Sequence, residues 1–226
     1  MERVLDAAAD LLVRRGYRGV TVEDVARQAG VGKGTVYLHV RTKDALLLTV
    51  LLRAQWNLFS DLADRFVADP AMVLPWRMTR ALYERLQADD VARALYLGDA
   101  EVLGRVAREA AGTLGDLATR RDAVVREHVE LLRAAGLVAD DLPVVEQIHG
   151  WGAVAYGFFA TAGIRRAEEM SAPVDPDRHG ELLEHALQRL LTGSGAAPDA
   201  RIANAVAGLY RPLVEHVDTE WRRRVR

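Results

Sequence analysis

The amino-acid sequence predicts an all-α protein with a small three-helix amino-terminal domain followed by a larger helical bundle. Apolar residues recur at three- and four-residue spacing along most of the 226 residues, which is the pattern of amphipathic helices. A sustained alternation of apolar and polar residues is absent, and neither Asn-Gly nor Asp-Gly occurs as a hairpin signal. These three observations favour helices throughout.

Five apolar residues at helical spacing predict the first helix: Val4, Leu5, Ala8, Leu11 and Leu12. Gly16 is expected to end this helix in the left-handed conformation. Thr21 offers an N-cap hydroxyl for a short second helix, with Asp24 three residues later. Gly30 should end that helix.

A third short helix should turn Val36 and Val40 inward. Thr42 then caps a long helix from about residue 43 to 67, which Asp69-Pro70 ends. After Pro75 we expect further helices at 74–88, 89–97, 99–110, 113–135, 143–166, 177–192 and 198–224. The segment 170–177, which contains two prolines, is typical of a surface loop.

Residues 21–40 fit a helix-turn-helix. Two short helices that cross steeply need a small residue at their contact, which Ala26 supplies, and a residue that tolerates a positive φ in the turn, which Gly30 supplies. Three valines can close a miniature core: Val25, Val31 and Val36. The second helix then carries polar residues that packing does not require.

Residues 1–50 resemble the TetR family of bacterial regulators, whose amino-terminal domain has three helices. The resemblance rests on Gly16-Tyr17, on the run Thr21 to Ala26, on Ala29-Gly30-Val31 and on Lys33 to Tyr37 with His39, and it continues in Lys43 to Leu46. Val40 stands where the family usually has phenylalanine, and the first helix starts without a basic arm. The resemblance implies a DNA-binding domain at 1–46 and an effector-binding and dimerisation domain at 47–226.

Seven residues are implied by this resemblance to contact operator DNA: Thr21, Lys33, Gly34, Thr35, Tyr37, His39 and Lys43. Lys33 would donate to guanine acceptors or a phosphate in the major groove, Thr35 would touch a base edge or a methyl group, and Gly34 would permit close approach. Tyr37, His39 and Lys43 would hold phosphates, as would Thr21 at its helix N-terminus. An alternative for Tyr37 is a place in the core, and His39 and Lys43 could be ordinary solvated side chains.

The resemblance also implies an apolar effector pocket in the second domain. Its wall is predicted to include four aromatic residues: Trp56, Trp76, Tyr96 and Trp151. The alternative for each is an ordinary place in the core. The glycine-rich segment 150–157 suggests close approach of helices. By resemblance, this helix and 177–192 would form a four-helix homodimer interface, and two heads would read a near-palindromic operator.

Composition excludes several classes of site and of protein. The chain has no cysteine, which excludes disulfides and thiolate sites. Residues 1–50 have a net charge of +2 and the remainder −4, so the positive end lies at the amino terminus. No apolar stretch is long enough for a membrane helix, and no signal region follows Met1, so we expect a cytoplasmic protein without a membrane partner.

We predict no cofactor, no metal site and no catalytic set. Glu146 with His149, and Glu181 with His185, are isolated acid–histidine pairs, whereas a bundle metal site needs several that converge. The favoured hypothesis is a repressor that a small, largely apolar ligand releases from its operator. An activator or constitutive regulator with the same head, and a helical-bundle enzyme or carrier, remain as alternatives.

Overall fold

The computed structural model describes residues 1–97, 111–164, 175–195 and 197–224. Within these ranges the regular structure is helical, and one isolated antiparallel bridge joins Val138 and Thr192. The all-α prediction is therefore confirmed. The helices are α1 (Glu2–Gly19), α2 (Val22–Ala29), α3 (Lys33–His39), α4 (Lys43–Ala68), the 3₁₀ helix η1 (Pro70–Val73), α5 (Pro75–Ala88), α6 (Asp90–Leu97), α8 (Ala111–Ala134), α9 (Val144–Ile164), α10 (Pro176–Leu191) and α11 (Ala200–Arg222). The helix expected at 99–110 lies outside the described residues.

The chain packs as two compact units that are interleaved in sequence. Unit 1 comprises Met1–Ser60, Asp89–Arg120 and Pro212–Arg226, and unit 2 comprises Asp61–Ala88 and Arg121–Arg211. The helices α4, α8 and α11 each contribute residues to both units. The boundary expected at residue 46 separates a DNA-binding domain from an effector-binding domain. It is a division by function and not by packing, and it stays a prediction.

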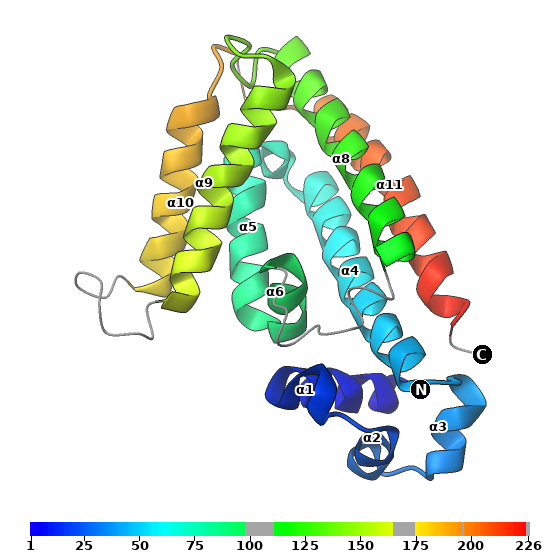
Figure 1. Ribbon diagram of the computed structural model, residues 1–226. Helices are drawn as coiled ribbons and strands as arrows, with labels where there is room; N and C mark the ends of the chain where they lie inside the picture. Colours follow the sequence, from blue (N-terminus) through cyan, green and yellow to red (C-terminus); the bar gives the residue numbers. More distant parts are fainter. Residues whose placement is uncertain (98–110, 165–174, 196, 225–226) are drawn as a thin grey trace. The chain divides into compact units, whose positions relative to one another are not determined.

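Unit 1 is built around α1, α2, α3 and the first part of α4 (Figure 1). Its core includes Leu5, Leu12, Val25 and Leu47, each at most 1% exposed. Gly16 has the expected positive φ of 62°. It forms a kink rather than an end, because helical structure continues to Gly19.

Unit 2 contains α5, α9 and α10, which lie side by side (Figure 1), and α10 packs on both of the others. Phe66, Leu132, Leu183 and Leu187 are fully buried there. The loop after α8 meets the segment after α10 so closely that a Cβ on Gly193 would lie 2.3 Å from the carbonyl oxygen of Gly136. Glycine is therefore required at residue 193.

Two local expectations were incomplete or wrong. The sequence predicted no structure at 70–73, but Asp69 caps η1 through its carboxylate, which accepts from the Ala71 amide at 2.9 Å. The loop predicted to reach residue 177 ends earlier, because Pro176 starts α10 behind the N-cap Asp175. Proline suits this position, since the first helical amide has no partner within the helix. The rest of that predicted loop, 170–174, lies outside the described residues.

Candidate functional site

The turn between α2 and α3 has the geometry that its sequence predicts. The Thr21 hydroxyl accepts from the Asp24 amide at 3.1 Å, which caps the start of α2. At the other end Gly30 is left-handed (φ 66°, ψ 36°), and its N–H points to the carbonyls of Ala26 and Arg27. Three residues later α3 begins, and Figure 1 shows the two short helices crossing steeply. This is a helix-turn-helix.

The helix α3 buries one side and exposes the other. Val36 is completely buried and Val40, just after the helix, is 3% exposed, so these two residues fix α3 to the core of unit 1. The predicted contact residues that are exposed on α3 number four: Lys33, Gly34, Thr35 and Tyr37. Tyr37 is 45% exposed, which does not fit the alternative of a core ring. His39 is half-buried, and Thr21 is exposed at the start of α2.

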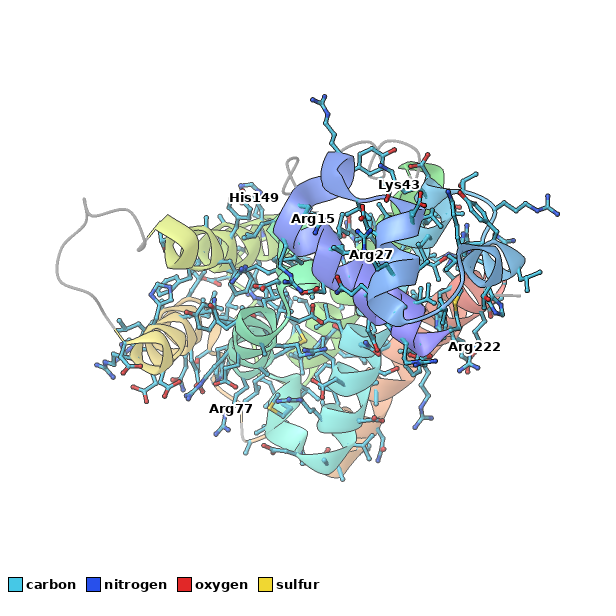
Figure 2. All side chains as sticks on the ribbon, turned by 90° about the horizontal axis from the view of Figure 1, so that it is seen from below. Arg15, Arg27, Lys43, Arg77, His149 and Arg222 are labelled. Atoms are coloured by element: carbon cyan, nitrogen blue, oxygen red, sulfur yellow. The ribbon has the colours of Figure 1, made fainter. Side chains whose placement is uncertain are left out.

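The surface around this motif is basic. Residues 14–43 hold seven arginines and lysines against two acidic residues, Glu23 and Asp24. Asp24 accepts a hydrogen bond from the Thr21 hydroxyl at 2.7 Å and is paired with Arg27 and Arg15. The hydroxyl first, and then the arginines, lower the pKa of Asp24. Figure 2 shows Arg15, Arg27 and Lys43 gathered around these helices. A polyanion would meet a net positive surface here.

Lys33 and Lys43 have different surroundings. The Lys33 ammonium lies 3.2 Å from a Glu23 carboxylate oxygen, and both side chains are more than half exposed. The Lys43 ammonium donates to the Tyr17 carbonyl oxygen at 3.0 Å and lies 4.1 Å from the centre of the Tyr17 ring. The Tyr17 hydroxyl in turn donates to Asp44 at 2.6 Å. Lys43 thus joins the end of α1 to the start of α4, and its predicted phosphate contact stays a prediction.

The four aromatic residues predicted to line an effector pocket lie in both units. Trp56 and Tyr96 belong to unit 1, where the Trp56 ring is 6.2 Å from that of Trp221. Trp76 and Trp151 belong to unit 2 and are buried. The Trp151 indole N–H donates to the Thr79 hydroxyl at 2.8 Å. Of the four, Trp76 lines a cavity described next.

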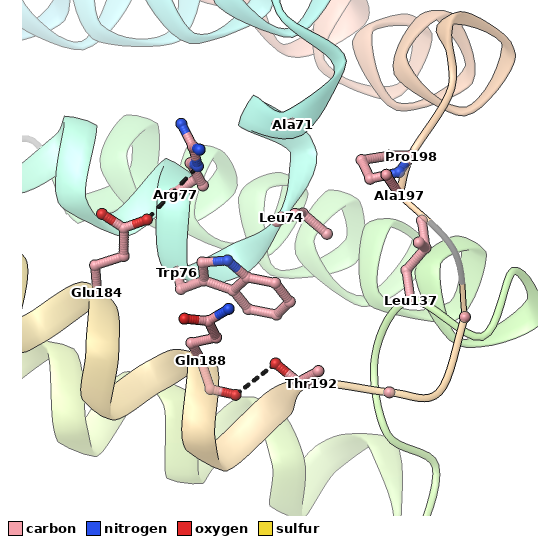
Figure 3. A pocket seen from close by; sticks show the side chains of 12 residues that line it. Ala71, Leu74, Trp76, Arg77, Leu137, Glu184, Gln188, Thr192, Ala197 and Pro198 are labelled. Carbon is pink, nitrogen blue, oxygen red and sulfur yellow. Dashed lines mark hydrogen bonds and ion pairs between the residues drawn. The ribbon is translucent and has the colours of Figure 1, made fainter.

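This cavity in unit 2 has a volume of about 410 Å³ and is formed by α5, η1, α10 and the segment after α10 (Figure 3). One wall is apolar, with the Trp76 ring beside Leu74 and Leu137. The other carries Gln188 and Glu184, and Glu184 pairs with Arg77 at 3.5 Å. The cavity is open to solvent, and its lining mixes apolar with polar side chains.

Comparisons with known proteins agree with the motif. The family described as bacterial regulatory proteins, tetR family, matches residues 4–50. Residues 4–50 thus match the amino-terminal domain of tetR-family regulators. YwcC, an uncharacterized HTH-type transcriptional regulator of Bacillus subtilis, is 44% identical over 54 residues, which are 24% of each chain. The repressor KstR2 of Rhodococcus jostii is 31% identical over 118 residues, or 51% of this chain and 56% of that protein. These matches thus span only a quarter to just over half of each relative.

The likeness to solved structures extends further along the chain. FadR of Bacillus subtilis in complex with stearoyl-CoA is 16% identical, with a TM-score of 0.56 over 86% of this chain and 98% of that one. At this identity the likeness shows only that the fold is shared.

Two features of the site were missed by sequence reasoning. Tyr17 anchors Lys43, which no spacing rule indicates, because the two residues are 26 positions apart. Leu38, in the middle of α3, is 79% exposed. Helical spacing could have found Leu38, since it lies two residues from both Val36 and Val40 and so points away from the buried side.

Within the described residues, none of the helices is long and apolar enough to span a membrane. Nor do three potential metal ligands converge anywhere in that part of the chain.

Proposed function

We propose that this chain is a DNA-binding transcriptional regulator of the TetR family that acts in the cytoplasm, as a repressor released from a palindromic operator by a small, largely apolar ligand. The observation that carries the proposal is the two-sided character of α3. Val36 and Val40 hold the helix, while Lys33 and Thr35 project into solvent within a basic surface. A short helix held in this way fits the major groove of DNA.

Each exposed side chain has a role that its chemistry suits. Lys33 donates to guanine acceptors or a phosphate, and Thr35 touches a base edge. Tyr37 and His39 hold phosphates and so fix the register on the duplex. Thr21 and Lys43 complete the phosphate contacts, and Lys43 reaches the DNA from its position beside Tyr17. Gly34 leaves room for a base.

We also propose a homodimer through α9 and α10. One face of α9 is exposed along its length, at Val145, His149, Gly152, Ala153, Tyr156 and Gly157. A Cβ added to Gly152 or Gly157 would meet nothing within 4 Å, although glycine destabilises a helix by about 1 kcal/mol relative to alanine. No contact described within the chain offsets that cost. A second copy that packs closely on this face would offset it.

Two observations support the proposal that a ligand regulates DNA binding: the cavity beside Trp76 and the complex of FadR with stearoyl-CoA. A ligand that binds one conformation of the chain better than another shifts the population, and DNA binding then changes by linkage. Because the proposed ligand is small and largely apolar, the first probe is a long-chain fatty acid, the acyl part of stearoyl-CoA, which we expect to weaken DNA binding. Trp76, which lines this cavity, is the proposed ligand contact.

The test uses the full chain and duplex DNA from the intergenic region upstream of its own gene. We expect sequence-selective, salt-sensitive binding that Lys33→Ala weakens at least about fivefold, because a charge-assisted base contact contributes about 1–3 kcal/mol. The matched control is Arg77→Ala, which removes one cation from unit 2. Binding without sequence preference, or equal affinities for both variants, would contradict the proposal.

A separate measurement tests the dimer. Tyr156→Glu should convert the dimer to a monomer in sedimentation analysis, because it places a charge in the proposed apolar contact. A wild-type chain that sediments as a monomer at all concentrations would contradict the dimer. A reporter assay distinguishes repression from activation.

A further inference from the structure

Leu38 is the most exposed large apolar side chain in the described part of the protein, at 79%. It lies in α3, between Tyr37 and His39, on the side away from the buried Val36. Single exposed leucines are common on protein surfaces. This one is unusual in its surroundings, because it stands among the residues that face solvent on the helix proposed to bind DNA.

The turn before Leu38 is open. Side chains of a helix lean toward its N-terminus, so Leu38 extends over the turn that contains Gly34 and Thr35. A Cβ built on Gly34 would meet no atom within 4 Å, so the packing of the chain does not require glycine there. Gly34 thus leaves exposed backbone about one turn before Leu38, and we call this backbone the shelf.

The charges around this shelf indicate what covers it. Lys33 precedes it, Arg41 follows it, and both are exposed within the basic stretch 14–43. An apolar protein partner or a lipid tail that covered Leu38 would also have to desolvate these cations, whereas a nucleic acid would pair with them. In the major groove of DNA the C5 methyl of thymine is the apolar group on a base edge. Leu38 is the apolar side chain of α3 that is free to meet it.

We propose that Leu38 is a specificity-determining residue that packs against a thymine methyl in each operator half-site, and that the missing side chain of Gly34 lets the base edge approach. The inference rests on the proposed function and adds to it a base identity. It predicts a thymine at a fixed position of each half-site.

The test begins with selection of duplex sites from a random library by the full chain. Each thymine of the selected sequence is then replaced singly by deoxyuridine, which removes the methyl group alone. We expect one thymine per half-site to be sensitive. Loss of one buried methyl should weaken binding about fourfold, and about fifteenfold when both half-sites are changed.

Three variants complete the experiment. Leu38→Ala should bind thymine and deoxyuridine equally at the sensitive position, with an unchanged salt dependence, because the phosphate contacts remain. Val67→Ala, at a 52% exposed residue of α4 in unit 2, should retain the wild-type sensitivity. Gly34→Ala should stay folded and lose selectivity, because its methyl group would occupy the shelf.

The outcomes separate the two proposals. Selection of no sequence would overturn the proposed function, and this inference with it. A selected sequence at which the wild type binds deoxyuridine as well as thymine at every position would overturn the inference alone. So would a deoxyuridine penalty that persists in Leu38→Ala. Full selectivity in Gly34→Ala would overturn the role of Gly34.

Discussion

Protonation of His128 should destabilise unit 2 as the pH falls from 7 to 5. The His128 ring is completely buried in α8. Its Nε2 atom lies 2.8 Å from the Val73 carbonyl oxygen and its Nδ1 atom 3.1 Å from the Tyr210 hydroxyl. Because a carbonyl only accepts, Nε2 carries the proton, and the neutral Nδ1 accepts from Tyr210. The site therefore holds the neutral imidazole.

The size of the effect follows from the pKa. Burial lowers the pKa of His128 from 6.5 to about 4, and the hydrogen bond to Val73 opposes the change only in part. The unfolded chain therefore binds more protons than the folded one between these two values. This contribution to stability is nearly complete at pH 7 and is lost as the pH falls through 6.5 to below 4, by about 3 kcal/mol in total. Between pH 7 and pH 5 the loss is about 2 kcal/mol.

Urea unfolding at pH 7, 6 and 5, in wild type and in His128→Gln, measures this loss. The variant cannot titrate at residue 128, so the difference between the two pH dependences isolates His128 from the other groups. Equal losses in both proteins would refute the reasoning. If His128→Gln fails to fold, NMR titration of the wild-type ring replaces it, and a native pKa near 6.5 would refute the reasoning equally well.

Three further predictions concern other contacts. Gly193→Ala should lower the free energy of unfolding by about 1–3 kcal/mol, measured with urea, because its Cβ would overlap the Gly136 carbonyl. Glu23→Gln should raise affinity for DNA by about two- to fivefold in low salt, measured by fluorescence anisotropy, because it releases Lys33 from its ion pair. Arg53→Gln should destabilise unit 1 by about 1 kcal/mol in thermal unfolding at low salt, because Arg53 bridges two carboxylates of α1 at 2.9 and 2.7 Å.

Each of these changes has a control. Gly208→Ala, where an added Cβ meets nothing, should not destabilise the chain. A similar loss there would contradict the clash at Gly193. The effect of Glu23→Gln should vanish in high salt, and an effect that persists would exclude the electrostatic explanation. The loss in Arg53→Gln should likewise shrink with salt, and a constant loss would indicate packing instead.

The local structure was largely predictable because its signals are local. Thr21, Gly30 and Thr42 act within four residues of themselves, and each has the expected capping role or backbone conformation. The same reasoning failed at Gly16, where a positive φ kinks the helix without ending it. It failed there because contacts distant in sequence, which a local pattern does not contain, decide whether the helix resumes.

The site was predictable in part for the same reason. Helical spacing correctly predicted that the side chains of Lys33 and Thr35 are exposed. It could not show that Lys33 meets Glu23, because the turn brings the two helices together. The aromatic residues predicted to line one pocket show that the sequence does not indicate which distant stretches of the chain pack together. Trp56 and Trp76 belong to different units, since each unit is assembled from separate stretches of the chain and composition does not say which stretches combine.

The interleaving of the two units limits how this protein can be divided or recombined. The hydrophobic cluster that contains Val25 and Val36 also contains Val91, Leu117 and Trp221. A fragment that ends near residue 60 would lack these last three side chains and leave apolar surface bare. In a chimera joined at residue 46, core residues from one parent would have to pack against core residues from the other. Exchange of DNA specificity between relatives is therefore better made by grafting surface residues of α3 than by swapping whole amino-terminal segments.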